Sequence, residues 1–343
     1  MKSERFFPAE WYEQSCVQLT WPHVNTDWSG YLIDADDCFL DIARHISERE
    51  KLIIVCSEID RVKVLTKSLN TRNIIYLNIP NNDTWARDHG GITVFENGYP
   101  VIMNFQFNGW GLKFPSNLDN QITRKIFERS IFGKNVKLEN HLDFVLEGGS
   151  IESDGRGVLL TTSNCLLSEN RNEMFGKEII EERLKNYFNV RKILWLEHGF
   201  LEGDDTDSHI DTLARFCDEK TICYVKCDDE DDIHYNALKS MEEQLLEFTD
   251  LNSRKYDTVP LPMAEPMYHE DERLPATYAN FLIINDAVLV PVYGSKKDSE
   301  AIDILKNIFK GRDIIPIDCS VLVRQHGSLH CVTMQYPKGV LDE

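Results

Sequence analysis

The chain has 343 residues, of which 42% are hydrophobic and 10% aromatic, so it carries enough apolar material for a large core and is not intrinsically disordered. Its 57 acidic and 37 basic residues give a formal net charge of −20, which argues against a nucleic-acid partner. Solubility alone would explain this charge, but so would an acidic cleft that attracts a small cation. No apolar run is long enough to span a membrane.

The nine cysteines and the amino terminus both favour a cytoplasmic location. Nine is an odd number, and the cysteines lack the spacing of a disulfide framework, so we expect free thiols in a reducing compartment. The first residues, MKSERFFPAEWYEQ, lack the charged start, apolar stretch and cleavage site of a secretory signal.

Short β-branched segments alternate with amphipathic segments along the chain, without a low-complexity stretch or an interdomain linker, which predicts one α/β domain over residues 1–343. The predicted strands are 51–56, 73–79, 100–105, 157–162, 192–196, 221–226, 281–285 and 287–292. The predicted helices carry apolar stripes at Phe39–Ile46, Ile122–Ile131, Ile180–Phe188, Leu238–Phe248 and Ile302–Phe309, the last ending at Gly311. Periodicity alone leaves open whether the strands form one sheet, a barrel or a ring of small sheets.

Four segments combine reactive side chains with glycine, which is typical of loops that present a functional group. They are 83-DTWARDHGG, 146-LEGGS, 203-GDDTDSHID and 327-GSLHCVTMQ. Taken singly, Asp88 would cap a turn, Glu147 would pair at the surface, His209 would be a hydrogen-bonded core histidine and Cys331 an inert thiol. Together they supply a thiol, an imidazole and several carboxylates, which favours a catalytic site.

The spacing within two of these segments suggests how the side chains are presented. In an extended strand, His209 and Asp211 would point to the same side and face one ligand. Cys331 precedes the alternating apolar residues Val332 and Met334, so we expect it at a turn that leads into a strand. A cysteine with a distant histidine is the minimum set for nucleophilic catalysis by sulfur.

A metal or nucleotide cofactor has little support in the sequence. Zinc ligands could be drawn from His326, His330 and Cys331, or from three other cysteines, Cys217, Cys223 and Cys227, but neither set has the spacing of a well-defined zinc motif. No glycine-rich nucleotide-binding motif occurs. We therefore expect neither a metal nor an organic cofactor.

The motifs 84-TWARDHG, 147-EGGSIESDGRGVLLTT, 203-GDDTDSHID and 328-SLHC resemble those of the agmatine deiminase and bacterial-type peptidylarginine deiminase family, within the guanidino-group modifying enzymes. The resemblance runs from 7-FPAEW and 20-TWPH to 335-QYP. It implies a five-bladed, pseudo-symmetric α/β propeller of ββαβ-type units around a central channel. Dividing 343 residues by five gives roughly 69 residues per unit.

Residue by residue, the resemblance implies a nucleophile at Cys331, a general acid and base at His209, and guanidinium-binding carboxylates at Asp88 and Asp211, with Glu147 beside the histidine. A guanidinium stays cationic in water, so carboxylates on its edge can hold it while its central carbon stays open to attack. Attack by a thiolate gives a neutral adduct, then a covalent thiouronium, and finally a ureido product. The two aspartates should raise the pKa of Cys331, and a bound substrate cation should reverse this effect.

The preferred substrate is agmatine, hydrolysed to N-carbamoylputrescine and ammonia, a step from arginine towards putrescine. Its second cation could be received by Trp85 and Asp205, although Trp85 could equally be core and Asp205 could cap a turn. Ser208 stands where agmatine-specific members usually have glycine, and Met334 replaces a common glutamine.

Three alternatives stay open at this point. They are a deiminase of peptidyl or free arginine, an amidinotransferase, and a non-catalytic binder of polyamines or basic peptides. A homodimer is possible.

Overall fold

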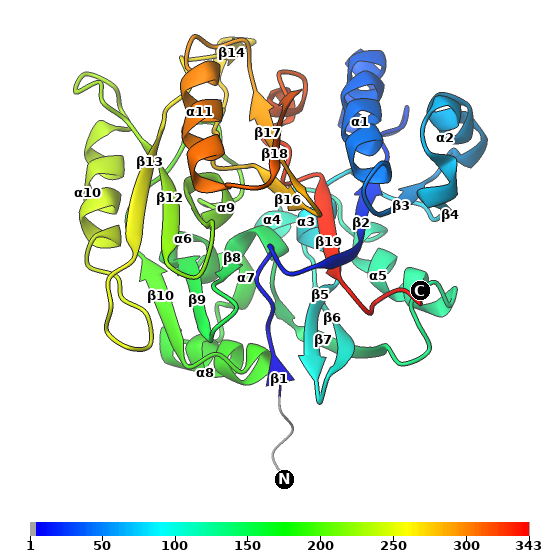
Figure 1. The fold of residues 1–343 in the computed structure, drawn as a ribbon, viewed down its shortest axis with the longest axis horizontal. Helices are drawn as coiled ribbons and strands as arrows, with labels where there is room; N and C mark the ends of the chain where they lie inside the picture. Colours follow the sequence, from blue (N-terminus) through cyan, green and yellow to red (C-terminus); the bar gives the residue numbers. More distant parts are fainter. Residues whose placement is uncertain (1–4, 343) are drawn as a thin grey trace.

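The computed structural model describes residues 5–342, a mixed α/β chain in which helices and strands alternate from end to end (Figure 1). The helices are α1 (Leu32–Ser47), α2 (Ile59–Leu65), α3 (Ala86–His89), α4 (Gly109–Leu112), α5 (Ile122–Glu128), α6 (Ser163–Leu166), α7 (Glu169–Asn172), α8 (Lys177–Phe188), α9 (Ile210–Leu213), α10 (Tyr235–Leu245) and α11 (Asp298–Ile308). No helix within these residues is both long and apolar enough to cross a membrane.

The described strands form five sheets of three or four strands and one small hairpin. Two sheets have four strands, which are, in spatial order, β1 (Arg5–Phe6), β5 (Ile92–Glu96), β6 (Tyr99–Gln106) and β7 (Lys137–Val145) in one, and β19 (Thr333–Pro337), β2 (Gln14–Thr20), β3 (Lys51–Cys56) and β4 (Ile74–Asn78) in the other. Three sheets have three strands. They are formed by β8 (Ile151–Ser153), β9 (Val158–Thr162) and β10 (Lys192–Leu196); by β11 (Ala214–Phe216), β12 (Thr221–Lys226) and β13 (Asp257–Pro262); and by β16 (Leu282–Ile284), β17 (Ala287–Val292) and β18 (Asp313–Asp318). The hairpin joins β14 (Tyr268–His269) to β15 (Glu272–Arg273).

All five sheets share one pairing pattern. An antiparallel pair is followed by a parallel neighbour, as in β5–β6–β7, β8–β9–β10, β11–β12–β13, β16–β17–β18 and β19–β2–β3. A parallel pair needs a crossover, and a helix supplies it each time: α5, α8, α10, α11 and α1, respectively. The helices α1, α8, α10 and α11 lie along the outside of the molecule, whereas α3 and α9 lie near its middle (Figure 1). The chain therefore repeats one strand–strand–helix–strand unit five times.

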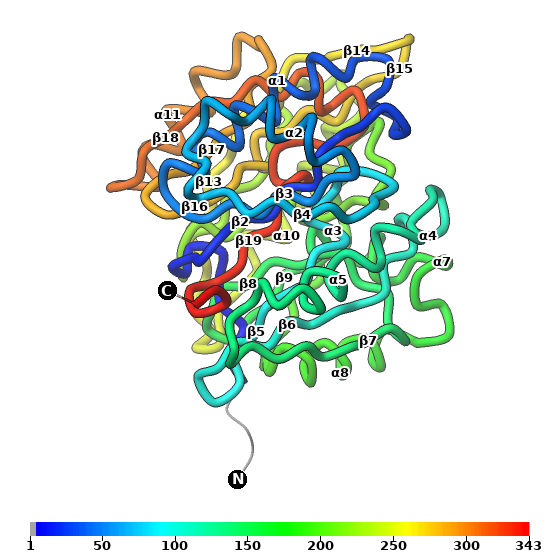
Figure 2. Tube along the Cα trace, turned by 90° about the vertical axis from the view of Figure 1, so that its right-hand side faces the viewer, coloured from blue at the N-terminus to red at the C-terminus, as the bar shows by residue number. Residues whose placement is uncertain are grey.

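The two ends of the chain meet in one sheet. The strand β19, near the carboxyl end, pairs antiparallel with β2, near the amino end, with Gln335 opposite Val17 (Figure 2). Strand β2 then continues parallel to β3. The fifth unit is thus assembled from both ends of the sequence.

The crossover helices bury one apolar stripe against their sheets. In α1, the stripe of Phe39, Ile42 and Ile46 is fully buried, in the same apolar cluster as Leu52 and Ile54 of β3. Alternate residues of β3 face opposite sides, so its two faces contribute to two different clusters. All nine cysteines are free, as the sequence predicts, and all nine are buried.

Every strand predicted from the sequence is present, with boundaries within one or two residues. Three predicted helices are shorter than expected. The helix α5 ends before Ile131 because Ser130 adopts a left-handed φ of 54°, and α10 and α11 end before Phe248 and Phe309. Gly311, the expected cap, has a φ of 94° three residues beyond the end of α11.

Replacement of Leu289 in β17 by alanine should lower the free energy of unfolding by about 2–5 kcal/mol, because its side chain is fully buried between neighbours that cannot fill the space. The matched control is Leu246→Ala at the end of α10, where the side chain is 47% exposed and the loss should be below about 1 kcal/mol. Urea unfolding of both variants measures the difference. Equal losses would contradict the described core.

Candidate active site

The candidate site is built from equivalent positions of the five units. The segment just before the first strand of each unit carries a polar residue or a glycine. These residues are Asp88 before β5, Glu147 and Gly149 before β8, His209 and Asp211 before β11, Asn280 before β16, and Cys331 before β19. The repeated architecture thus delivers five distant segments of the sequence to one region.

Gly149 marks the point where three predicted site residues meet. A Cβ atom placed on it would lie 2.7 Å from Nδ1 of His209, 2.9 Å from Oδ1 of Asp88 and 3.0 Å from Oδ2 of Asp211. Its backbone N–H donates to Asp88 Oδ1 at 3.0 Å. Only a residue without a side chain fits here, and this explains the glycine of the 146-LEGGS segment.

Cys331 shares a cavity of about 390 Å³ with Asp88. The cavity is lined by Asp27, Asp83, Trp85, Asp88, Trp110, Phe114, Gly203, Asp204, Asp205, Thr206, Gln325, His326, Gly327 and Cys331. The thiol of Cys331 donates to Oδ1 of Asn280 at 3.4 Å, and its residue lies two positions before β19, at the turn the sequence predicts. The cavity therefore offers a thiol and a carboxylate to one bound molecule.

The expectation that His209 and Asp211 share a strand is wrong. His209 is the residue that precedes α9, and Asp211 lies within that helix. The chain turns sharply here because Asp207 and Ser208 have left-handed φ values of 66° and 65°, which also explains why glycine would suit position 208. The two side chains nevertheless both reach Gly149.

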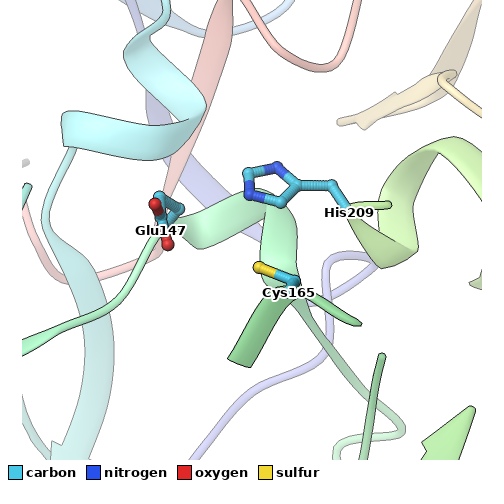
Figure 3. Close-up of side chains that lie close together, drawn as sticks. All are labelled: Glu147, Cys165 and His209. Atoms are coloured by element: carbon cyan, nitrogen blue, oxygen red, sulfur yellow. The ribbon is translucent and has the colours of Figure 1, made fainter. Parts of the chain in front are cut away.

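His209 is surrounded by groups that favour its cationic form. Its ring faces Glu147 and the sulfur of Cys165 (Figure 3), and one donor or ligand atom from each of these three residues lies within 4.8 Å of the others. Its Nδ1 is 3.6 Å from Oδ1 of Asp88. Burial alone would lower the pKa of His209, but Asp88, Cys165 and Glu147 raise it well above the usual value. His209 can therefore supply a proton at neutral pH.

Glu147 lies beside His209, but its direct partner is an arginine that the sequence did not single out. Both carboxylate oxygens accept from Nε of Arg171, at 2.9 and 3.1 Å, and both side chains are fully buried. Arg171 also donates to Asp207 at 2.5 Å and to the carbonyl of Thr206 at 2.8 Å. Arg171 thus ties Glu147 to the segment that presents His209.

The two expected guanidinium-binding carboxylates have different partners. Oδ2 of Asp88 accepts from the indole N–H of Trp110 at 2.9 Å, and burial raises the pKa of Asp88. Oδ2 of Asp211 lies 2.7 Å from Nδ1 of His330. Burial alone would raise the pKa of Asp211, but His330 outweighs it and the pKa is lowered. Oδ1 of Asp211 is buried and has no hydrogen-bond partner among the described residues, which leaves an acceptor for a cationic donor.

The thiol of Cys331 is held in its neutral form. Burial raises its pKa well above the usual value, and the negative charges of Asp211 and Asp88 raise it further. This agrees with the electrostatic effect expected from the sequence.

Trp85 and Asp205 both line the cavity, as predicted. The indole N–H of Trp85 donates to Asp83 at 3.0 Å, and its ring packs so closely on Gly327 that a Cβ there would lie 2.2 Å from it. Burial and Asp204 raise the pKa of Asp205 to about 6. The turn is capped by Asp204, which accepts from Thr206 and Ser208, so Asp205 has no capping role.

Trp110 is a lining residue that the sequence analysis missed. It lies in a run of left-handed residues, Gly109 to Leu112, that aims its ring into the cavity and its N–H at Asp88. The two flanking glycines were the available signal for this turn.

Neither zinc triad considered from the sequence comes together within the described residues. Two other clusters of possible ligands do, namely Glu147 with Cys165 and His209, and Glu10 with Glu152 and His330. In each cluster an arginine already binds a carboxylate, Arg171 in the first and Arg215 in the second.

Comparison with known proteins decides the family. The model of the Porphyromonas-type peptidyl-arginine deiminase family matches residues 6–337. The chain belongs to this family. A Porphyromonas gingivalis protein, provisionally named an arginine deiminase, is 50% identical to this chain and has a TM-score of 0.96, with 99% of this chain and 100% of that one covered.

Two other similar proteins are named agmatine deiminases. A cysteine-to-serine variant of C. jejuni agmatine deiminase with substrate bound is 40% identical, with a TM-score of 0.92 over 98% of each chain. Agmatine deiminase of Pseudomonas aeruginosa is 31% identical over 354 residues, which covers 96% of this chain and 95% of that protein.

Removal of a negative charge beside the thiol should make Cys331 more reactive. Asp88→Asn should lower the pKa of Cys331 and raise its rate of alkylation by iodoacetamide at pH 8, by about tenfold for each unit by which the pKa falls. Peptide mass spectrometry separates Cys331 from the other buried thiols. The exposed Asp60→Asn is the matched control and should leave the rate unchanged. Slower alkylation in Asp88→Asn would contradict the electrostatic explanation.

Proposed function

We propose that this protein hydrolyses agmatine to N-carbamoylputrescine and ammonia, with Cys331 as the nucleophile. The observation that carries the proposal is the cavity that Cys331 shares with Asp88, beside the point where Asp88, His209 and Asp211 surround Gly149. A thiol, a cationic imidazole and two carboxylates fit the attack of sulfur on a guanidinium carbon.

The first half-reaction replaces ammonia with sulfur. Asp88 and the free Oδ1 of Asp211 hold the guanidinium by its edge, and the substrate cation lowers the cost of ionising Cys331, whose proton leaves to solvent. A bond forms between Sγ and the central carbon, the bond from that carbon to a terminal nitrogen breaks, and His209 gives its proton to the departing ammonia. A thiouronium on Cys331 is left.

The second half-reaction replaces sulfur with water. His209, now neutral, takes a proton from the water that attacks the same carbon, and the bond to Sγ breaks. The second proton of that water passes to the leaving sulfur, so the products are the ureido compound and the regenerated thiol. Glu147 supports both steps by stabilising the protonated form of His209, although Arg171 and not His209 is its hydrogen-bond partner. This chemistry requires no metal or organic cofactor.

The lining of the cavity favours agmatine over arginine. Among the described lining residues, five are aspartates and none is lysine or arginine, so the α-carboxylate of arginine has no full cation to bind. Agmatine instead carries a second cation, which Asp205 and the ring of Trp85 are placed to receive. Names of relatives support this choice, since C. jejuni and P. aeruginosa proteins are agmatine deiminases. The product would feed a route from arginine to putrescine.

A second candidate is the deimination of free or peptidyl arginine. The provisional name of the P. gingivalis relative and the description of the family favour it. Amidino transfer shares the first half-reaction and differs only in the final acceptor. A non-catalytic binder needs no ordered thiol and imidazole beside the carboxylates, so the complete set argues against it.

We also infer that the five repeated units close into a five-bladed propeller, with the site in its central channel, and that they form one catalytic domain. Three observations support this arrangement: the common pairing pattern, the junction of β19 with β2, and the convergence of the five segments that precede the first strand of each unit. A cytoplasmic location and a homodimer stay predictions.

The substrate proposal is tested by incubating the purified protein separately with agmatine, arginine and a peptide with internal arginine. Agmatine should give equal amounts of ammonia and ureido product, and Cys331→Ser should reduce the rate by at least about a thousandfold. A ureido product from the peptide or arginine alone would reject agmatine as the substrate. Undiminished turnover by the serine variant would reject the mechanism.

The role of Asp205 is tested with a substrate that lacks the second cation. Asp205→Asn should raise the KM for agmatine by about five- to twentyfold but leave the KM for n-butylguanidine unchanged. Because Asp205, with a pKa of about 6, loses its charge below that pH, the preference of the unmodified protein for agmatine should fall as the pH drops through 6. A variant with the same effect on both substrates would exclude this role.

A further inference from the structure

A buried network of charged side chains lies directly behind the catalytic residues. Its centre is His330, which is 1% exposed and precedes Cys331 in the chain. Around it lie Glu10, Asp211 and Arg215, and Arg215 is fully buried. The mechanism above uses Asp211 but gives no role to His330, Glu10 or Arg215.

His330 bridges two buried carboxyl groups and also contacts an arginine. Nδ1 lies 2.7 Å from Oδ2 of Asp211, and Nε2 lies 2.6 Å from Oε2 of Glu10. Nη2 of Arg215 lies 3.0 Å from the same Nε2. A carboxylate can only accept a hydrogen bond, so Nδ1 donates to Asp211. The ring of His330 is therefore held between Asp211 on one side and Glu10 with Arg215 on the other.

This bridge sets the orientation of Asp211. Because Oδ2 is committed to His330, the rotation of the carboxylate is fixed and the unpartnered Oδ1 is left for a ligand. Asn280 strengthens the link, since its Oδ1 accepts from the backbone N–H of His330 at 2.9 Å and its Nδ2 donates to the carbonyl of Asp211 at 3.3 Å. The same Oδ1 accepts from the thiol of Cys331.

The far end of the bridge is anchored in the core. Oε1 of Glu10 accepts from the backbone N–H of Ile283 at 2.8 Å, and Oε2 accepts from Arg215 at 2.7 Å. Arg215 in turn donates to the carbonyl of Phe281 at 2.7 Å and forms a short ion pair with Glu152. The ring of His330 is thus fixed from the side opposite to Asp211.

His330 does not face the substrate cavity. It lines a separate small cavity of about 50 Å³, together with Glu10, Arg87 and Gly148. Two pairs of consecutive residues separate the two cavities: Arg87 and His330 line the small one, whereas Asp88 and Cys331 line the substrate cavity. A side chain behind this one-residue wall can act on the substrate only through its neighbours.

We propose that His330 is a positioning residue, a buried ring clamped by Glu10 and Arg215 that holds Asp211 with one oxygen free for the guanidinium and keeps Cys331 in register with it. The role in guanidinium binding rests on the proposed function, whereas the hydrogen bond from His330 to Asp211 does not.

The binding test uses the Cys331→Ser background, in which no turnover occurs. Isothermal titration with agmatine and with arginine should show that His330→Gln weakens the better ligand by at least about tenfold, the cost of a misplaced charged hydrogen bond. In the Asp211→Asn background the same substitution should change the affinity by less than about threefold, because the group through which His330 acts is already altered. Equal weakening in both backgrounds would reject an action through Asp211.

The hydrogen bond from His330 to Asp211 is tested without substrate. Ring ¹⁵N resonances of histidine-labelled protein should show a protonated Nδ1 for the histidine whose signals vanish in His330→Gln. Those signals should move in Glu10→Gln. An unprotonated Nδ1 at His330 would overturn the proposal, because Nδ1 could then not donate to Asp211. Binding of arginine but not agmatine would reject the proposed substrate while leaving the result for His330 intact.

Discussion

The structure depends on the absence of a side chain at Gly149. A buried imidazole and two buried carboxylates approach one backbone position so closely that any Cβ would collide with all three. His209 and Asp211 come from the segment before β11, and Asp88 comes from the segment before β5, which holds the equivalent position in another repeated unit. No single loop could form this site, because residues more than a hundred positions apart must meet within a hydrogen-bond distance. The fold brings them together.

Buried charge is the second constraint, and each buried carboxylate of the site has its own hydrogen-bond or ion-pair partner. Asp88 accepts from Trp110, Glu147 is bound by Arg171, and Asp211 is bound by His330. An uncompensated buried charge would cost about 3–5 kcal/mol, so these partners are as necessary to folding as to chemistry. The unpartnered oxygen of Asp211 and the raised pKa of Cys331 are not compensated in this way, and a planar cation would relieve both.

The sequence predicted the reactive residues better than the residues that hold them in position. Asp88, Glu147, His209, Asp211 and Cys331 stand beside glycines in short polar segments, and that local pattern predicted a common site. His209 and Asp211 were predicted to share a strand, but they lie at a turn and in the short helix that follows it. The prediction failed because the same residue types occur in both kinds of local structure. Arg171, Asn280 and His330 were missed as supports because their partners lie far away in the sequence. The arrangement of the strands in five sheets could not be predicted from periodicity either, because periodicity identifies strands but not their neighbours.

The pairing of β19 with β2 has a consequence for biosynthesis. The strand that follows the nucleophile is made long after its partner has left the ribosome. Until β19 is made, β2 has one edge without a neighbour, and Cys331 is not held at the cavity. A nascent chain that ends before β19 would thus hold most of the acidic residues but no nucleophile in place, so that activity requires β19.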